Sequence, residues 1–237
     1  MSEPSAPETF DSELRVPMED VVRFVRQLCH DLRNQLNAAE LQSAYVREIA
    51  EDAELKAEVQ RLRGMLSEMG ASLQQLTGLL SAVRTNPIPY KAGEFVEDFK
   101  TKLNHDFPAE SPSVEWDVNV QSETLEIDPQ LLQQALTELF VNAFRHDRSE
   151  GPLKVTAHTD GDRLILGLRE PKINFEQPTE NWGQQPFQKV KHGHYGLGLR
   201  RARAIVEAHQ GRFEARFDPA SSSLNTTVTL PLSGARL

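Results

Sequence analysis

His30, Asp31 and Asn34 lie within about one helical turn of one another, in a segment whose apolar residues recur every three or four positions. That periodicity predicts a helix with His30 on the side opposite the apolar residues, facing solvent. An imidazole beside a carboxylate can act as a nucleophile, because the carboxylate fixes the tautomer and makes the other ring nitrogen more basic. A surface histidine on a charged helix has the same pattern, and this segment alone leaves that interpretation open.

A second group of polar residues recurs at helical spacing further along the chain. Glu138, Asn142 and His146 are four apart and share one face of a helix that we expect to begin at Asp128-Pro129. Asn142 follows an apolar pair, so its amide needs hydrogen bonds or a ligand. Asn142 and Glu138 together could supply oxygen ligands to Mg²⁺. An asparagine that belongs to a cap or a hydrogen-bond network is the alternative.

A glycine-containing loop precedes the last predicted helix. Gly196 and Gly198 stand directly before that helix, whose N-terminus would offer free N–H groups to a phosphate. Many tight turns share this pattern, so the signal is weak. His192 and His194 flank Gly193 in the same loop, but without further ligands we interpret them as loop residues rather than a metal site.

Two long helical segments are predicted before residue 86, separated by a polar turn near residue 52. The second segment has apolar residues spaced alternately four and three apart, which is the 3.5-residue period of a coiled coil. They are Leu55, Val59, Leu62, Leu66, Met69, Leu73, Leu76, Leu80 and Val83. A hairpin of two such helices cannot close a core alone, so we expect it to dimerise into a four-helix bundle.

The remaining sequence combines strand and helix patterns, which is typical of an α+β domain. Alternating residues over 114–120 predict a strand, 153–159 and 163–168 predict a hairpin, and a helix over 199–209 precedes two final strands. We therefore expect a flexible tail over 1–16, a helical hairpin over 17–86 and an α/β-sandwich domain over 90–237. Residues 171–194 show no periodicity and predict a long loop, which in a compact domain is usually functional or mobile.

The composition narrows the classes of partner. The chain has 237 residues and a net charge of −9, which argues against nucleic acid or an anionic membrane as the main partner. One cysteine, Cys29, excludes an intrachain disulfide and a Cys-rich metal site. No apolar run approaches the ~18 residues of a membrane span and the start lacks a secretory pattern, so we expect a cytoplasmic protein.

Taken in order, these segments resemble the motifs of sensor histidine kinases over about residues 20–232. Residues 24–36 around His30 resemble the H-box, residues 128–146 the N-box, residues 186–190 the F-box, and residues 196–199 with the following helix the G2-box. The resemblance implies a dimerisation and histidine-phosphotransfer hairpin followed by a Bergerat-type ATP-binding domain, with ATP and Mg²⁺ as cofactors. It further implies a homodimer and an aspartate-bearing response-regulator receiver as partner. Since 237 residues leave no room for a sensor region, we expect input from another chain, such as a separate sensor protein, from the tail or through the bundle.

The resemblance also implies a role for each matching residue. His30 would accept the phosphoryl group, and Asp31 would orient the His30 ring and act as base. Asn34 would help to place a water molecule when the protein acts as a phosphatase. Asn142 would bind Mg²⁺ with Glu138 in support of the metal shell. The nucleotide would be held by Arg145 and His146 near the phosphates or ribose, and by Gly196 and Gly198 in the phosphate-side loop.

The adenine-reading motif of the family, D-x-G-x-G, is altered here. Glu170 stands at the aspartate position, and Lys172 and Asn174 replace both glycines, which would crowd the pocket. Gln35 stands where the H-box usually has proline. Three hypotheses follow: an active histidine kinase, an ATP-independent dimeric histidine phosphotransferase with a relic nucleotide domain, and a non-enzymatic scaffold. A serine kinase of the anti-sigma type is disfavoured, because it lacks such a hairpin.

Overall fold

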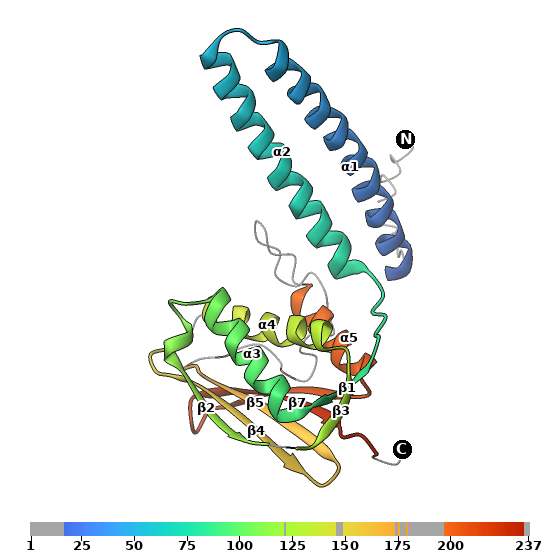
Figure 1. The fold of residues 1–237 in the computed structure, drawn as a ribbon. Coiled ribbons are helices and arrows are strands. Elements are labelled where there is room, and N and C mark those ends of the chain that lie inside the picture. The colour runs from blue at the N-terminus through green and yellow to red at the C-terminus, as the bar shows by residue number, and fades with distance from the viewer. Residues whose placement is uncertain are drawn as a thin grey trace, which may run out of the picture. The chain divides into compact units, whose positions relative to one another are not determined.

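The computed structural model describes residues 17–120, 122–145, 149–173, 175, 179 and 197–234. The chain divides into two compact units, one ending at Leu80 and one beginning at Ser81. Figure 1 shows a pair of long helices in the first unit and a layered α/β fold in the second. Both match the predicted fold class of a helical hairpin followed by an α/β sandwich.

The first unit is an antiparallel hairpin of α1 (Met18–Ile49) and α2 (Ala53–Leu80). The turn lies where the polar segment predicted it, and Asp52 begins α2 by accepting a hydrogen bond from the Glu54 N–H at 2.9 Å. The helix ends at Leu80, so Val83 falls outside it. Among the described residues, no helix is both long and apolar enough to cross a membrane.

The apolar heptad seam of α2 divides between two faces of the hairpin. Val59 and Leu80 are buried, whereas Leu55, Leu62 and Met69 remain 46%, 45% and 55% exposed. On α1, Cys29 is buried, whereas Leu28 and Leu32 of the predicted apolar face are 44% and 37% exposed. Part of each seam therefore closes the hairpin, and part forms an uncovered apolar stripe.

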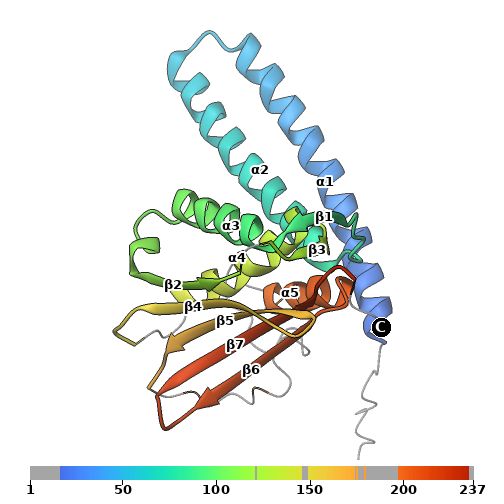
Figure 2. The same ribbon diagram turned by 60° about the horizontal axis from the view of Figure 1, so that its bottom comes forward.

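The second unit is a five-stranded sheet in the order β2-β4-β5-β7-β6, with helices on one face (Figures 1 and 2). Only the β2–β4 pair is parallel within that sheet. The strands are β2 (Val114–Asn119), β4 (Leu153–Asp160), β5 (Arg163–Pro171), β6 (Arg212–Asp218) and β7 (Ser223–Pro231). The helices are α3 (Ala92–Asp106), α4 (Pro129–Arg145) and α5 (Gly198–Ala208), with a 3₁₀ turn at Ser111–Ser113. A separate ladder pairs β1 (Ile88–Lys91) with β3 (Thr124–Ile127).

The core of this unit fills the space between the helices and the sheet. Residues of β4 alternate between buried and exposed, as a strand covered on one side must. Phe95 and Phe99 from α3 and Leu132 and Phe140 from α4 complete the apolar layer. The helix layer is thereby fixed on the sheet by burial rather than by surface contacts.

His209 ties the end of α5 to the beginning of α4. Its Nδ1 lies 2.7 Å from the Ile205 carbonyl oxygen, and its Nε2 accepts a hydrogen bond from the Asp128 N–H at 2.9 Å. The Asp128 carboxylate in turn caps α4 by accepting from the Leu131 N–H at 3.1 Å. The two helices that carry the candidate nucleotide residues are thus held in a fixed relation.

Candidate functional site

The His30 ring on α1 projects into solvent beside two polar neighbours. Its side chain is 64% exposed, and that of Asp31 is 56% exposed. Nδ1 of His30 lies 3.2 Å from Oδ1 of Asp31 and 3.4 Å from Nδ2 of Asn34, one turn further along the helix. The Asp31 carboxylate also accepts a hydrogen bond from Gln27 at 2.8 Å. The structure therefore brings together all three residues singled out in this segment.

The contact with Asp31, the shorter of the two, favours one tautomer of His30, and in that tautomer Asn34 Nδ2, itself a donor, does not bond to Nδ1. An ionised carboxylate only accepts hydrogen bonds, so Nδ1 of the ring carries the proton that Asp31 receives. The lone pair is then on Nε2, and no described residue forms a hydrogen bond with that atom. An exposed imidazole with a free, basic Nε2 is a competent nucleophile towards a phosphoryl group.

Asn142 and Glu138 lie one turn apart on α4, as expected. The Asn142 amide nitrogen donates to the Glu138 carbonyl oxygen at 2.6 Å, which leaves Oδ1 as the acceptor of that half-buried side chain. The Glu138 carboxylate reaches the first residue of α5: a Cβ added to Gly198 would lie 2.3 Å from Glu138 Oε2. Glycine at position 198 is therefore required for this close approach.

The residues of α4 fit a magnesium ion that is shared with a nucleotide. The described residues contain no cluster of three or more histidine, cysteine, aspartate or glutamate side chains that could hold a metal unaided. Mg²⁺ keeps most of its coordination for water and phosphate, and one or two protein oxygens suffice. Oδ1 of Asn142 has the required chemistry, with its amide nitrogen already anchored on the helix backbone.

Glu170 and Lys172 form a buried ion pair at the end of β5. Nζ of Lys172 lies 2.8 Å from Oε1 of Glu170, and the two side chains are only 6% and 7% exposed. The Lys172 ammonium also lies 5.7 Å from the centre of the Phe175 ring, which packs against Phe217 of β6 at 5.8 Å. The carboxylate that was expected to read adenine thus faces an internal cation.

The backbone around this pair is held from two sides. The Lys172 N–H donates to the Ser222 carbonyl oxygen at 2.8 Å, and the Ile173 N–H donates to Ser149 Oγ at 3.0 Å. Sequence reasoning identified Lys172 only as a residue that crowds the pocket. The available signal was the spacing of Glu170 and Lys172, because residues two apart on a strand share one face.

Several residues singled out from the sequence lie outside the described part of the chain. They are His146, Asn174, the F-box segment 186–190, His192, Gly193, His194 and Gly196. Arg145 is the exposed last residue of α4. The structure accordingly places Glu138 next to Asn142 and Gly198. The predicted nucleotide-binding roles of His146 and Gly196 stay predictions.

Comparison with known proteins relates this chain to sensor kinases and its second unit to a family of ATPases. Residues 127–234 match the family described as histidine kinase-, DNA gyrase B-, and HSP90-like ATPase. The alginate biosynthesis sensor protein KinB of Pseudomonas aeruginosa is 29% identical over 103 residues, which are 42% of this chain and 17% of KinB. The adaptive-response sensory kinase SasA of a Nostoc species is 26% identical over 217 residues, which are 83% of this chain and 54% of SasA.

Two solved structures share the order of the units. Full-length ShkA, solved in complex with AMPPNP, aligns with a TM-score of 0.65 at 17% identity. The alignment covers 91% of this chain and 47% of the ShkA chain. The Acinetobacter baumannii histidine kinase AdeS aligns with a TM-score of 0.52 at 19% identity. The alignment covers 86% of this chain and 98% of the AdeS chain. At these identities the likeness is one of fold. The chain spans 17% of the length of KinB and 54% of the length of SasA.

Proposed function

We propose that this chain, which belongs to the sensor histidine kinases and has a helical hairpin followed by an ATPase domain, autophosphorylates on His30 and passes the phosphoryl group to a receiver aspartate. The observation that carries the proposal is the state of His30: an exposed ring with Nδ1 held by Asp31 and Nε2 unbonded among the described residues.

The proposed phosphorylation is an in-line displacement at the γ-phosphorus of ATP. The lone pair of His30 Nε2 forms the new N–P bond while the bond from phosphorus to the β,γ-bridging oxygen breaks, and ADP leaves with those electrons. The ring gains positive charge as it is phosphorylated. Asp31, 3.2 Å from Nδ1, stabilises that charge and can accept the Nδ1 proton. The phosphoryl group then moves from Nε2 to a carboxylate oxygen of the receiver.

The α/β domain would supply the nucleotide. Oδ1 of Asn142 would hold Mg²⁺, which neutralises phosphate charge when it is bound. Glu138 would hold the first turn of α5 in position through its contact with Gly198. The N-terminus of α5 would then direct its free N–H groups and positive dipole end towards phosphate oxygens.

Phosphate labelling of the purified chain tests the proposal. Incubation with Mg-ATP labelled at the γ position should give an acid-labile, base-stable phosphate, and His30→Gln should abolish it. His105→Gln is the matched control, because His105 is also an exposed histidine and should be dispensable. Label that survives in His30→Gln would refute His30 as the acceptor.

A second candidate function is favoured by the buried Glu170–Lys172 pair. If the ion pair with Lys172 prevents the Glu170 carboxylate from binding adenine, the chain would not bind ATP. His30 would then receive its phosphoryl group from another phosphoprotein and relay it. Calorimetry of Mg-ATP binding, with Asn142→Ala as control, separates the two. Saturable binding that is lost in the variant supports the kinase. Absence of binding up to millimolar ATP, together with labelling of His30 by a phosphorylated receiver, supports the phosphotransferase.

A further inference from the structure

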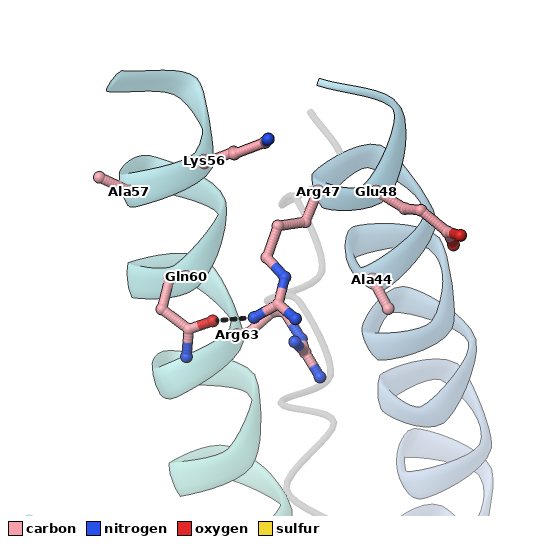
Figure 3. A pocket seen from close by; sticks show the side chains of 7 residues that line it. All are labelled: Ala44, Arg47, Glu48, Lys56, Ala57, Gln60 and Arg63. Carbon is pink, nitrogen blue, oxygen red and sulfur yellow. Dashed lines mark hydrogen bonds between the residues drawn. The ribbon is translucent and has the colours of Figure 1, made fainter. Parts of the chain in front are cut away.

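A second cluster of charged residues lies at the end of the hairpin far from His30. Near the turn, a groove between α1 and α2 is lined by Arg47 and Glu48 from α1 and by Lys56, Gln60 and Arg63 from α2. Figure 3 shows the guanidinium groups of Arg47 and Arg63 reaching towards each other from opposite helices. Arg47 is 17 positions after His30 on the same helix, or about 25 Å at the rise of an α-helix.

The cations of this groove have no acidic partners in the part of the chain that the structure describes. Arg47 donates to Oε1 of Gln60 at 2.7 Å, a neutral acceptor. The described ion pairs on the hairpin involve Arg23, His30 and Arg61 instead. Glu48, the acidic residue of the lining, projects away from α2 (Figure 3).

Arg63 provides a separate indication that the groove is incomplete. Its Nε is shielded from solvent and has no hydrogen-bond partner among the described residues. A buried N–H without an acceptor is costly, and two guanidinium groups that face each other repel unless an anion lies between them. Planar guanidinium groups are well suited to paired hydrogen bonds with phosphate oxygens.

We propose that this groove binds a phosphate group of a small molecule, clamped between Arg47 on α1 and Arg63 on α2, with Lys56 adding charge at the rim. Three cations and one carboxylate line the groove, which suits a ligand carrying about two negative charges. Since Arg47 and Arg63 come from different helices, a bound phosphate would strengthen the pairing of α1 and α2 at their turn. The site is independent of the proposed phosphorylation of His30.

Titration of the full-length chain with small phosphates tests this proposal. Inorganic phosphate, pyrophosphate and AMP would be titrated by calorimetry at constant ionic strength, in an Asn142→Ala background to suppress binding by the ATPase domain. We expect saturable binding that weakens at least tenfold in Arg47→Gln and in Arg63→Gln. Arg61→Gln is the matched control: Arg61 lies on the same helix but is exposed and paired with Glu58, so binding should be unchanged. Preference for AMP over inorganic phosphate would identify a nucleotide rather than the free anion as the source of the phosphate.

The same titrations specify what would overturn the site. Absence of saturable binding, or equal binding in wild type and Arg63→Gln, would refute it. A loss of dimer in Arg63→Gln without any phosphate binding would instead assign the groove to a carboxylate of a second copy. If Arg63→Gln is unfolded by circular dichroism, Arg63→Lys keeps the charge and removes the planar fork, and it should still weaken binding. In a chain that keeps Asn142, labelling of His30 should be unaffected by Arg47→Gln, Arg63→Gln and Arg63→Lys, so failure here leaves the proposed function intact.

Discussion

The carboxylate of Glu138 lies so close to the backbone of Gly198 that a Cβ at position 198 would stand 2.3 Å from Oε2 and 3.1 Å from Cδ. These residues are 60 positions apart and belong to different helices, α4 and α5. The contact places a carboxylate at the start of α5, where the helix dipole favours negative charge. It also fixes the distance between the helix that carries Asn142 and the helix that would receive phosphates.

Replacing Gly198 by alanine should separate function from stability. The clash is with the flexible end of a side chain, so Glu138 can move aside, and alanine is the better helix former by up to about 1 kcal/mol. We expect the free energy of unfolding to change by less than about 1 kcal/mol, while affinity for Mg-ATP falls because Glu138 leaves its position. Denaturant titration and calorimetry measure the two effects.

Gly211→Ala provides the contrast for that experiment. A Cβ at Gly211 would lie 2.6 Å from the Thr229 carbonyl oxygen and 2.9 Å from the Leu230 and Val206 side chains. These atoms belong to the backbone and the core, so we expect a loss of about 1–3 kcal/mol of stability. Wild-type affinity in Gly198→Ala would show that nucleotide binding does not depend on the position of Glu138.

Asn142→Ala should abolish Mg²⁺-dependent labelling and leave the fold intact. The substitution removes Oδ1 and one hydrogen bond to the Glu138 carbonyl oxygen, worth about 0.5–1.5 kcal/mol, which the helix propensity of alanine partly offsets. Thr137→Ala removes a similar bond, from Thr137 Oγ1 to the Gln133 carbonyl oxygen on the same helix, without touching the proposed ligand. Labelling that persists in Asn142→Ala would make Asn142 a structural residue.

The sequence predicted elements whose causes are local. The turn near residue 52 and the start of α4 at Asp128-Pro129 both follow from capping and backbone preferences, and both are confirmed. The face of each hairpin helix was less predictable. A 3.5-residue period shows that Val59 and Leu62 both lie in a seam, but it does not show which of them packs inside the hairpin and which remains exposed.

The candidate site was predictable as far as its parts are close in sequence. His30, Asp31 and Asn34 meet because they share one helical turn. The contact between Glu138 and Gly198 depends on how two helices pack, and no local pattern encodes it. The ion pair of Lys172 with Glu170 is an intermediate case, since their spacing places them on one face but their burial depends on the loop and strands around them.

The Glu170–Lys172 pair should be sensitive to the loss of either member. Lys172→Met would leave the Glu170 carboxylate buried beside an apolar side chain, and removing one partner of a buried pair costs about 3–5 kcal/mol. The double variant Glu170→Gln, Lys172→Met should recover much of that loss, because no unpaired charge remains. Unfolding in denaturant of the two single variants and the double variant gives the coupling, and additive effects would contradict the pair.

The titration of Asp218 should depend on Ser221. The Ser221 hydroxyl donates to Asp218 Oδ2 at 2.5 Å and the Ala220 N–H donates to Oδ1 at 3.0 Å, and these bonds lower the pKa of the Asp218 carboxyl. A carboxyl with a lowered pKa stabilises the fold above its unfolded pKa, and that contribution is lost as the pH falls through the folded pKa. We expect Ser221→Ala to raise the pKa of Asp218, measured by carboxyl-carbon NMR. An unchanged pKa would show that the Ser221 bond is not made in solution.

The uncovered apolar stripe of the hairpin should form the interface of a homodimer. It consists of residues from both helices that are 37–66% exposed: Phe24, Leu28, Leu32, Leu55, Leu62, Met65 and Met69. A stripe of this kind is stable in water only when another surface covers it, and a second copy offers the same pattern. We expect a dimer at micromolar concentration by sedimentation equilibrium, and a monomer after Leu62→Glu with Met69→Glu.

Ser67→Glu is the matched control for the dimer experiment. Ser67 is exposed on α2 and lies about 140° around the helix from Leu62, at 100° per residue. It therefore adds one of the two negative charges of the double variant to the same helix but away from the stripe, and the dimer should persist. Each dimer would contain two copies of His30, so the monomeric variant also reveals whether phosphorylation acts across the dimer. A wild-type chain that sediments as a monomer would instead leave the apolar stripe for a different protein to cover.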